Sequence, residues 1–124
     1  MAIYRIFPSQ DSAIYSEKPL MNTGRDELLE IGGYPNAGVG YTARTLIQFK
    51  TSDIQEVIDN KAGGSIASAS LHMYLNFASE VPTSFVIKSY PVMTEWSEGI
   101  GKFGDTPVNS AGCSWTGSDS GQYW

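Results

Sequence analysis

Short apolar runs separated by turn-forming residues constrain the fold of this chain more than any other feature. Thirteen glycines and six prolines occur among its 124 residues, largely between these runs. Turn signals at intervals of roughly 8–12 residues are typical of β-sandwiches. Strands do not alternate with long helical patterns, so a parallel sheet is not expected. The sequence therefore predicts an all-β fold, an antiparallel β-sandwich of the jelly-roll type.

Two segments, 44–50 and 67–75, alternate apolar and polar residues most regularly, as a strand with one buried face does. Further strands are expected at 3–8, 13–15, 28–31 and 85–92, and a loop at 34–40. The inner set of 67–75 is Ala69, Leu71, Met73 and Leu75. The predicted core consists of Ile47, Phe49, Ala69, Leu71, Met73 and Trp96.

A single short helix is expected near 52–60. Ile54, Val57 and Ile58 lie one turn apart and would share one helix face. Ser52 is a suitable N-cap, and Gln55 three residues later would complete a capping box.

The pattern divides the chain into a sandwich module at 1–109 and a tail at 110–124. The tail is rich in Gly and Ser, yet it carries Cys113, Trp115, Tyr123 and Trp124. Because exposed rings invite association, we expect the tail to pack on this domain or on a neighbouring chain, with Trp115 more buried than Trp124. The alternatives are a frayed end, the start of a closing strand, or the start of a longer chain.

The charge balance excludes a nucleic-acid partner, which would require clustered Lys and Arg. Net charge is −5, the isoelectric point is about 4.6, and the eight basic residues are scattered. No apolar run reaches the ~20 residues that span a bilayer, and the N-terminus lacks the pattern of a signal peptide. A single cysteine excludes an intrachain disulfide. We expect synthesis in a cytoplasm and no membrane partner.

Catalytic groups are not found in a useful combination, so we expect no enzyme activity and assign no catalytic residue. His72, the single histidine, lies mid-strand on the outer face, and Cys113 has no cationic neighbour in sequence to activate it. Glu95 and Glu98 flank Trp96, an arrangement also found in sugar sites. A structural corner, with the ring in the core and the acids solvated, explains them better.

No metal or cofactor site is assigned either. Acidic residues lie along the loops without zinc or EF-hand spacing: Asp11, Asp26, Glu27, Asp53 and Asp105. They could converge on a loop calcium ion, and the alternative is that they are solvated turn residues. The remaining candidates are aromatic side chains that could bind a sugar or a protein: Tyr34, Tyr41, Tyr74 and Trp115.

Several short motifs occur in an order that resembles the DNRLRE or disaggregatase-related β-sandwich family. They cover nearly the whole chain: residues 11–15, Asn22-Thr-Gly24, 28–32, Arg44-Thr-Leu-Ile-Gln-Phe49, 66–74, 87–92, Trp96-Ser-Glu-Gly99, Pro107 and Trp115. The resemblance implies a jelly-roll module of the carbohydrate-binding type.

The stretches at 1–11 and 95–105 also resemble structural proteins of large tailed phages of aquatic bacteria. This resemblance implies a non-catalytic attachment module in the virion, as a tail, fibre, neck or head component. Its partners would then be other virion proteins or copies of itself. The alternative function is a carbohydrate-binding module that recognises a polysaccharide.

Overall fold

The computed structural model describes residues 2–78, 84 and 86–124. The strands are β1 (Gln10–Tyr15), β2 (Gly32–Asn36), β3 (Val39–Gln48), β4 (Gly117–Asp119) and β5 (Gln122–Tyr123). A short helix, α1 (Thr51–Glu56), continues into a π-helical turn, η1 (Val57–Lys61). The mainly-β architecture and the helix near 52–60 are confirmed.

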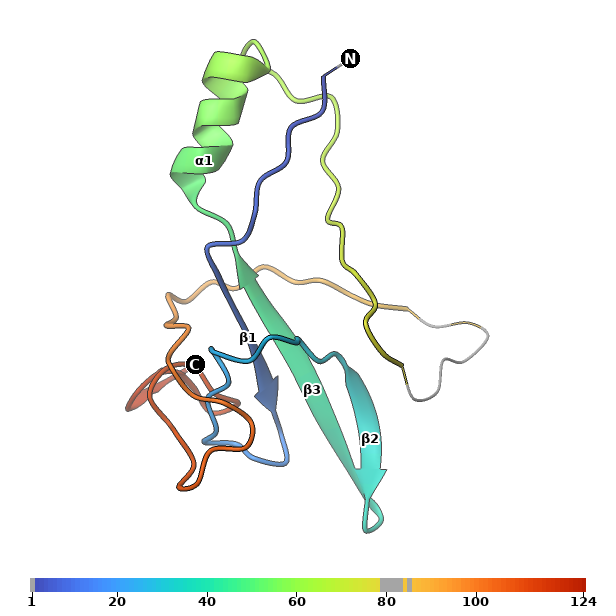
Figure 1. Cartoon of the computed structure of the whole chain (residues 1–124), viewed down its shortest axis with the longest axis vertical. Helices are drawn as coiled ribbons and strands as arrows, with labels where there is room; N and C mark the ends of the chain where they lie inside the picture. Colours follow the sequence, from blue (N-terminus) through green and yellow to red (C-terminus); the bar gives the residue numbers. More distant parts are fainter. Residues whose placement is uncertain (1, 79–83, 85) are drawn as a thin grey trace.

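Three strands form an antiparallel sheet in the order β1-β3-β2, with β3 at its centre (Figure 1). A two-residue turn, Ala37-Gly38, joins β2 to β3, and both residues have positive φ, 49° and 81°. Positive φ at both central positions defines the tight hairpin turn that matches the twist of its strands. The loop expected at 34–40 is therefore wrong, because Tyr34 and Tyr41 lie in paired strands.

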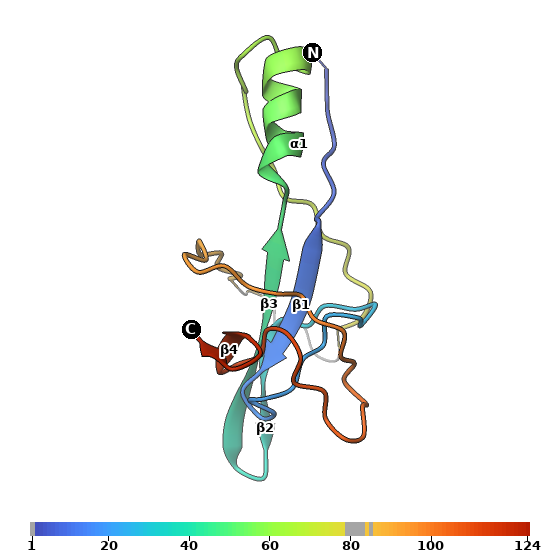
Figure 2. The same ribbon diagram turned by 90° about the vertical axis from the view of Figure 1, so that its left-hand side faces the viewer.

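The sheet is covered on both faces by different parts of the chain. Successive side chains point to opposite faces, so β1 and β3 contribute to two small apolar clusters. One cluster contains Ala13, Tyr15, Met21 and Ala43. The other contains Ile14, Leu46 and Cys113, with Trp96 and Trp115 packed against it. Figure 2 shows the segment that follows β1 on one side of the sheet and the segment with β4 on the other.

The tail packs on the sheet, as predicted. Cys113 is fully buried and Ser118 is almost so. Trp115 is half-buried, whereas Trp124 keeps 43 % of its surface exposed and donates from Nε1 to the Ser114 carbonyl at 2.9 Å. Residues 110–124 therefore contribute to the core.

A long segment after the helix, here called the arm, comprises residues 62–78, 84 and 86–95. It contains no helix or strand. Figure 1 shows it starting at the end of the helix that lies away from the sheet, running down beside the sheet, and crossing the sheet in its later part. The predictions of strands at 67–75 and 86–92 are therefore wrong. Phe85, the first residue of the second predicted strand, lies outside the described residues. Leu71 is 56 % exposed and Met73 49 % exposed.

The predicted core fails for the same reason. Alternation along a strand produces a buried face only where a second layer covers it, and no described segment covers the arm. Ala69, Leu71 and Met73 are exposed, while Ile47, Phe49 and Trp96 are half-buried. The core instead forms around β1, β3 and the tail.

Three local predictions are also corrected. Residues 3–8 and 28–31 form no strand, and β2 begins at Gly32. Ser52 does not cap the helix: the N-cap is Lys50, whose carbonyl accepts the N–H groups of Asp53 and Ile54. The Ser52 hydroxyl instead bonds the Asp53 carboxylate at 3.2 Å.

Candidate functional site

A buried asparagine organises the junction between the two ends of the chain. The Asn22 side chain is fully buried. Its Nδ2 donates to the carbonyls of Glu98 at 2.7 Å and Cys113 at 2.8 Å, and its Oδ1 accepts from the N–H groups of Gly24 at 3.2 Å and Gly101 at 2.8 Å. Every hydrogen-bonding position of the amide is thereby occupied, so this site is structural.

Glycines allow the backbone to approach Asn22 this closely. A Cβ atom at Gly24 would collide with the Glu98 carbonyl oxygen, and one at Gly101 would collide with the carbonyl oxygen of Asn22 itself. At Gly99 the added atom would meet the Ala111 carbonyl oxygen. The Asn-x-Gly turn and the Trp-x-Glu-Gly corner thus form a single interlocked unit.

The outer edge of β1 is closed by side chains from the same unit. Glu98 Oε1 accepts the Asp11 backbone N–H at 2.9 Å, and Thr23 Oγ1 donates to the Ala13 carbonyl at 2.6 Å. Partial burial, and then the Glu98 carboxylate, raise the pKa of the Asp11 carboxyl. Satisfied edge groups do not template further strand pairing. β1 is therefore protected from additional strands.

Cys113 and His72, the residues considered as nucleophile and base, do not lie in surroundings that suit these roles. Burial raises the pKa of the Cys113 thiol, which disfavours the reactive thiolate. Asn22 Nδ2 lies 3.9 Å from its sulfur. His72 is exposed in the arm. Cys113 thus packs as a small apolar side chain.

The structure brings together two of the four predicted aromatics. Tyr34 and Tyr41 are paired across β2 and β3, with ring centroids 5.9 Å apart and planes at 34°. Glu17 accepts from the Tyr34 hydroxyl at 2.6 Å and from Asn36 Nδ2 at 2.8 Å. We call Glu17, Tyr34, Asn36 and Tyr41 the tyrosine cluster. It presents half-buried rings beside a carboxylate and an amide.

Hydrogen bonding sets the ionisation of this cluster. The bond to Glu17 is the main cause that raises the pKa of Tyr34 to about 12, and partial burial adds to it. The same bond, together with that from Asn36, lowers the pKa of Glu17. At neutral pH the cluster therefore presents a carboxylate and a neutral phenol.

The other two predicted aromatics lie elsewhere. Tyr74 is fully exposed in the arm. Trp115 packs against the second apolar cluster, with the Arg44 guanidinium 4.8 Å from its ring centre, a cation–π geometry. Sequence reasoning missed Glu17 and Asn36, because only the hairpin places them beside Tyr34.

Two of the loop acids accept hydrogen bonds from backbone N–H groups, Asp105 within its own turn and Asp26 across 77 positions of the sequence. Asp105 accepts the Lys102 N–H at 2.9 Å, and Asp26 accepts the Phe103 N–H at 3.0 Å. Within residues 2–78, 84 and 86–124, no three Asp, Glu, His or Cys side chains gather as metal ligands. In the same residues, no helix has the length and apolar character to cross a membrane.

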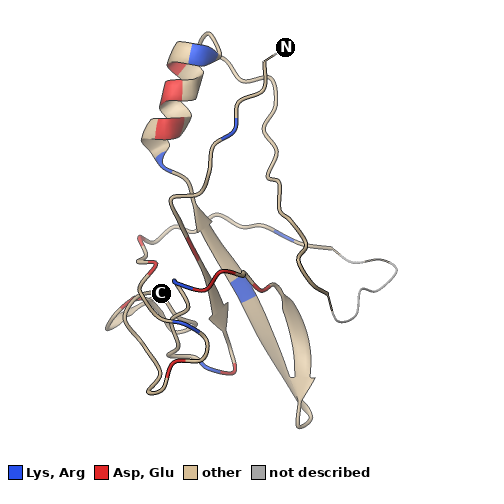
Figure 3. Ribbon diagram, in the orientation of Figure 1, with Lys and Arg blue, Asp and Glu red and all other residues tan. Residues whose placement is uncertain are grey.

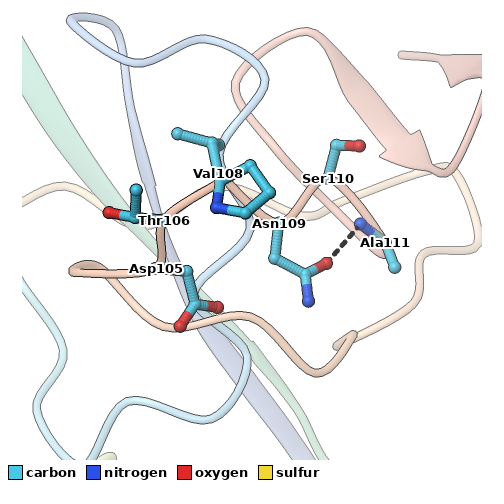
Figure 4. Close-up of a pocket in the computed structure, with 7 residues that line it drawn as sticks. Asp105, Thr106, Val108, Asn109, Ser110 and Ala111 are labelled. Atoms are coloured by element: carbon cyan, nitrogen blue, oxygen red, sulfur yellow. Dashed lines mark hydrogen bonds between the residues drawn. The ribbon is translucent and has the colours of Figure 1, made fainter.

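A shallow pocket lies along residues 105–111. Figure 4 shows these side chains, with Asn109 Oδ1 accepting the Ala111 N–H, a bond of 2.9 Å. Its lining has a single charged side chain, Asp105. The pocket offers no pair of groups for acid–base chemistry.

Comparisons with known proteins give no significant match to a family model, a curated protein or a solved structure. The family resemblance of the motifs stays a prediction.

Proposed function

We propose that this chain is a non-catalytic attachment module, held by protein–protein contacts to neighbouring components of a tailed-phage particle. The two-layer, jelly-roll-like sandwich is proposed to be completed in that assembly. The observation that carries the proposal is the amount of surface the chain leaves uncovered.

The accessible surface is 9652 Å² for a chain of 13.5 kDa. A folded monomer of this mass exposes about 6,500 Å², so the excess is about 3,000 Å². Stable obligate interfaces bury areas of this order and are rich in apolar side chains. The arm contributes many exposed apolar residues to this surface: Ile66, Leu71, Met73, Tyr74, Leu75, Phe77, Val86, Ile87, Tyr90, Val92 and Met93.

The test is the protein composition of purified particles from the source of the chain. Quantitative mass spectrometry should find the chain in a fixed ratio to the other structural proteins after density-gradient purification and a high-salt wash. Its absence from intact particles, with recovery only in the soluble lysate, would contradict the assignment to a virion.

A second candidate function is polysaccharide recognition, which the tyrosine cluster favours. Aromatic faces beside hydrogen-bonding groups suit a sugar ring. Affinity electrophoresis in gels containing polysaccharides would test it. Tyr34→Ala and Tyr41→Ala should each abolish retardation, while Tyr74→Ala, an exposed tyrosine outside the cluster, should not. Equal retardation of all variants would reject a site in the cluster.

A further inference from the structure

We infer that residues 67–75 of one copy of this chain add as a strand to β3 of a second copy, alongside residues 44–48. The inference rests on the proposed attachment function and names the partner within it. Both halves of the contact, a strand-like donor and an open acceptor edge, occur in the same chain.

The acceptor is the half of β3 that β2 does not reach. Register pairs Gly32, the first residue of β2, with Ala43, so no described strand lies beside residues 44–48 on that side. In antiparallel sheets, alternate residues direct their N–H and C=O groups to each side. β1 occupies the other side of β3. The Thr45 hydroxyl there donates to the Glu30 carbonyl at 3.0 Å, a contact that an added strand would replace. The half-edge can then accept one more strand.

The other sheet edges are less suitable. Thr23 and Glu98 close the outer edge of β1, as described above. The outer edge of β2 contains Pro35, which lacks the N–H needed for a ladder. Residues 44–48 are thus the best place for an added strand in the three-stranded sheet.

The donor has the composition of a strand buried in an assembly. Residues 67–75 contain no Lys, Arg, Asp or Glu, and Figure 3 shows the uncharged run after α1. Exposed strands usually carry charges or prolines that block pairing. Here Leu71, Met73 and Leu75 share one phase and are all exposed, so pairing would align them on one face of the sheet, and a second layer in the assembly would bury them.

A second copy fits the uncovered area. In the structure a chain's own arm forms no strand pair with β3, which leaves both donor and acceptor open. If each copy gives its residues 67–75 to another copy, every donor segment and every acceptor edge is paired, and no additional binding surface is needed. In a ring, each copy would divide its excess of about 3,000 Å² between two neighbours, about 1,500 Å² for each. Both sides of one interface would then bury about 3,000 Å² in total, within the range of obligate interfaces.

Light scattering after size-exclusion chromatography, over a wide range of protein concentration, tests the inference. The wild-type chain should run as an oligomer. Leu71→Asp and Met73→Asp should weaken self-association by at least about tenfold, because the assembly would bury a charge. Ser70→Asp, on the opposite phase of the same segment, should leave it unchanged. A monomeric wild-type chain, or equal effects of Ser70→Asp and Leu71→Asp, would overturn the inference.

Crosslinking separates exchange between copies from pairing within one chain. Gln48→Cys and Ser70→Cys copies, mixed and treated with a short thiol crosslinker, should yield crosslinked dimers. A chain that carries both Gln48→Cys and Ser70→Cys tests the alternative. If it crosslinks only within single chains, the inference that a second copy supplies the strand is wrong. A monomeric chain that still occurs in purified particles would overturn this inference and leave the attachment function intact.

Discussion

The Asn22 side-chain amide donates a hydrogen bond to the Cys113 carbonyl at 2.8 Å, across 91 positions of the sequence. This contact links the turn after β1 to the tail, which supplies the second apolar cluster. Because the same amide also bonds Glu98 and Gly101, the ends of the chain depend on each other for stability. The arm, in contrast, contributes little to this core.

Replacing Asn22 by Ala should strongly destabilise the fold. Two buried carbonyls and two N–H groups would lose their partner, and each unsatisfied group costs about 1–3 kcal/mol. We expect a loss of about 3 kcal/mol or more in the free energy of unfolding. Urea denaturation followed by tryptophan fluorescence measures it. Asn36→Ala, at an exposed site, is the control and should change stability by under about 1 kcal/mol.

Two glycine-to-alanine substitutions should show whether the cost in stability comes from a steric clash with nearby backbone or from the loss of glycine itself. Gly24→Ala places a methyl group against the Glu98 carbonyl, whereas Gly40→Ala meets no atom within 4 Å. Neither glycine has positive φ. We expect Gly24→Ala to cost about 1–3 kcal/mol and Gly40→Ala to stay within about 0.5 kcal/mol of wild type. Equal midpoints in thermal unfolding would contradict the interlocked unit.

The Asp11 carboxyl should make stability fall as pH rises. Its pKa is raised in the folded state by burial and by Glu98, so the folded chain binds more protons than the unfolded chain. The contribution is present below the unfolded pKa and is lost as pH rises through the folded pKa. Glu98→Gln should lower the pKa of Asp11, measured by carboxyl NMR titration. An unchanged Asp11 pKa would show that Glu98 has no influence on it.

The Tyr34–Glu17 bond should be visible in the alkaline titration. Tyr34 has a folded pKa of about 12, so its stabilising contribution is present below the unfolded value of about 10 and is lost as pH rises through the folded value. Glu17→Gln should lower the pKa of Tyr34, followed by NMR of its ring carbon. A Tyr34 pKa that is unchanged in Glu17→Gln would contradict the role of this bond.

The sequence by itself determined those helices and strands that a local pattern of residues is enough to specify. The apolar spacing of Ile54, Val57 and Ile58 indicated the helix, and alternation indicated the second half of β3, residues 44–48. These inferences hold because helix and strand periodicity follow from backbone geometry alone.

Tertiary structure decided which patterned segments are buried. The alternation at 67–75 is as regular as that at 44–48, yet only residues 44–48 pair with β1 and reach an apolar cluster, through Leu46. The sequence indicated Asn22 only as a turn residue, whereas its partners Glu98 and Cys113 lie 76 and 91 positions away. Glu17 reaches Tyr34 only because a tight hairpin follows Asn36. Burial requires a second surface, and which distant segment supplies it depends on chain closure and packing that no local pattern encodes.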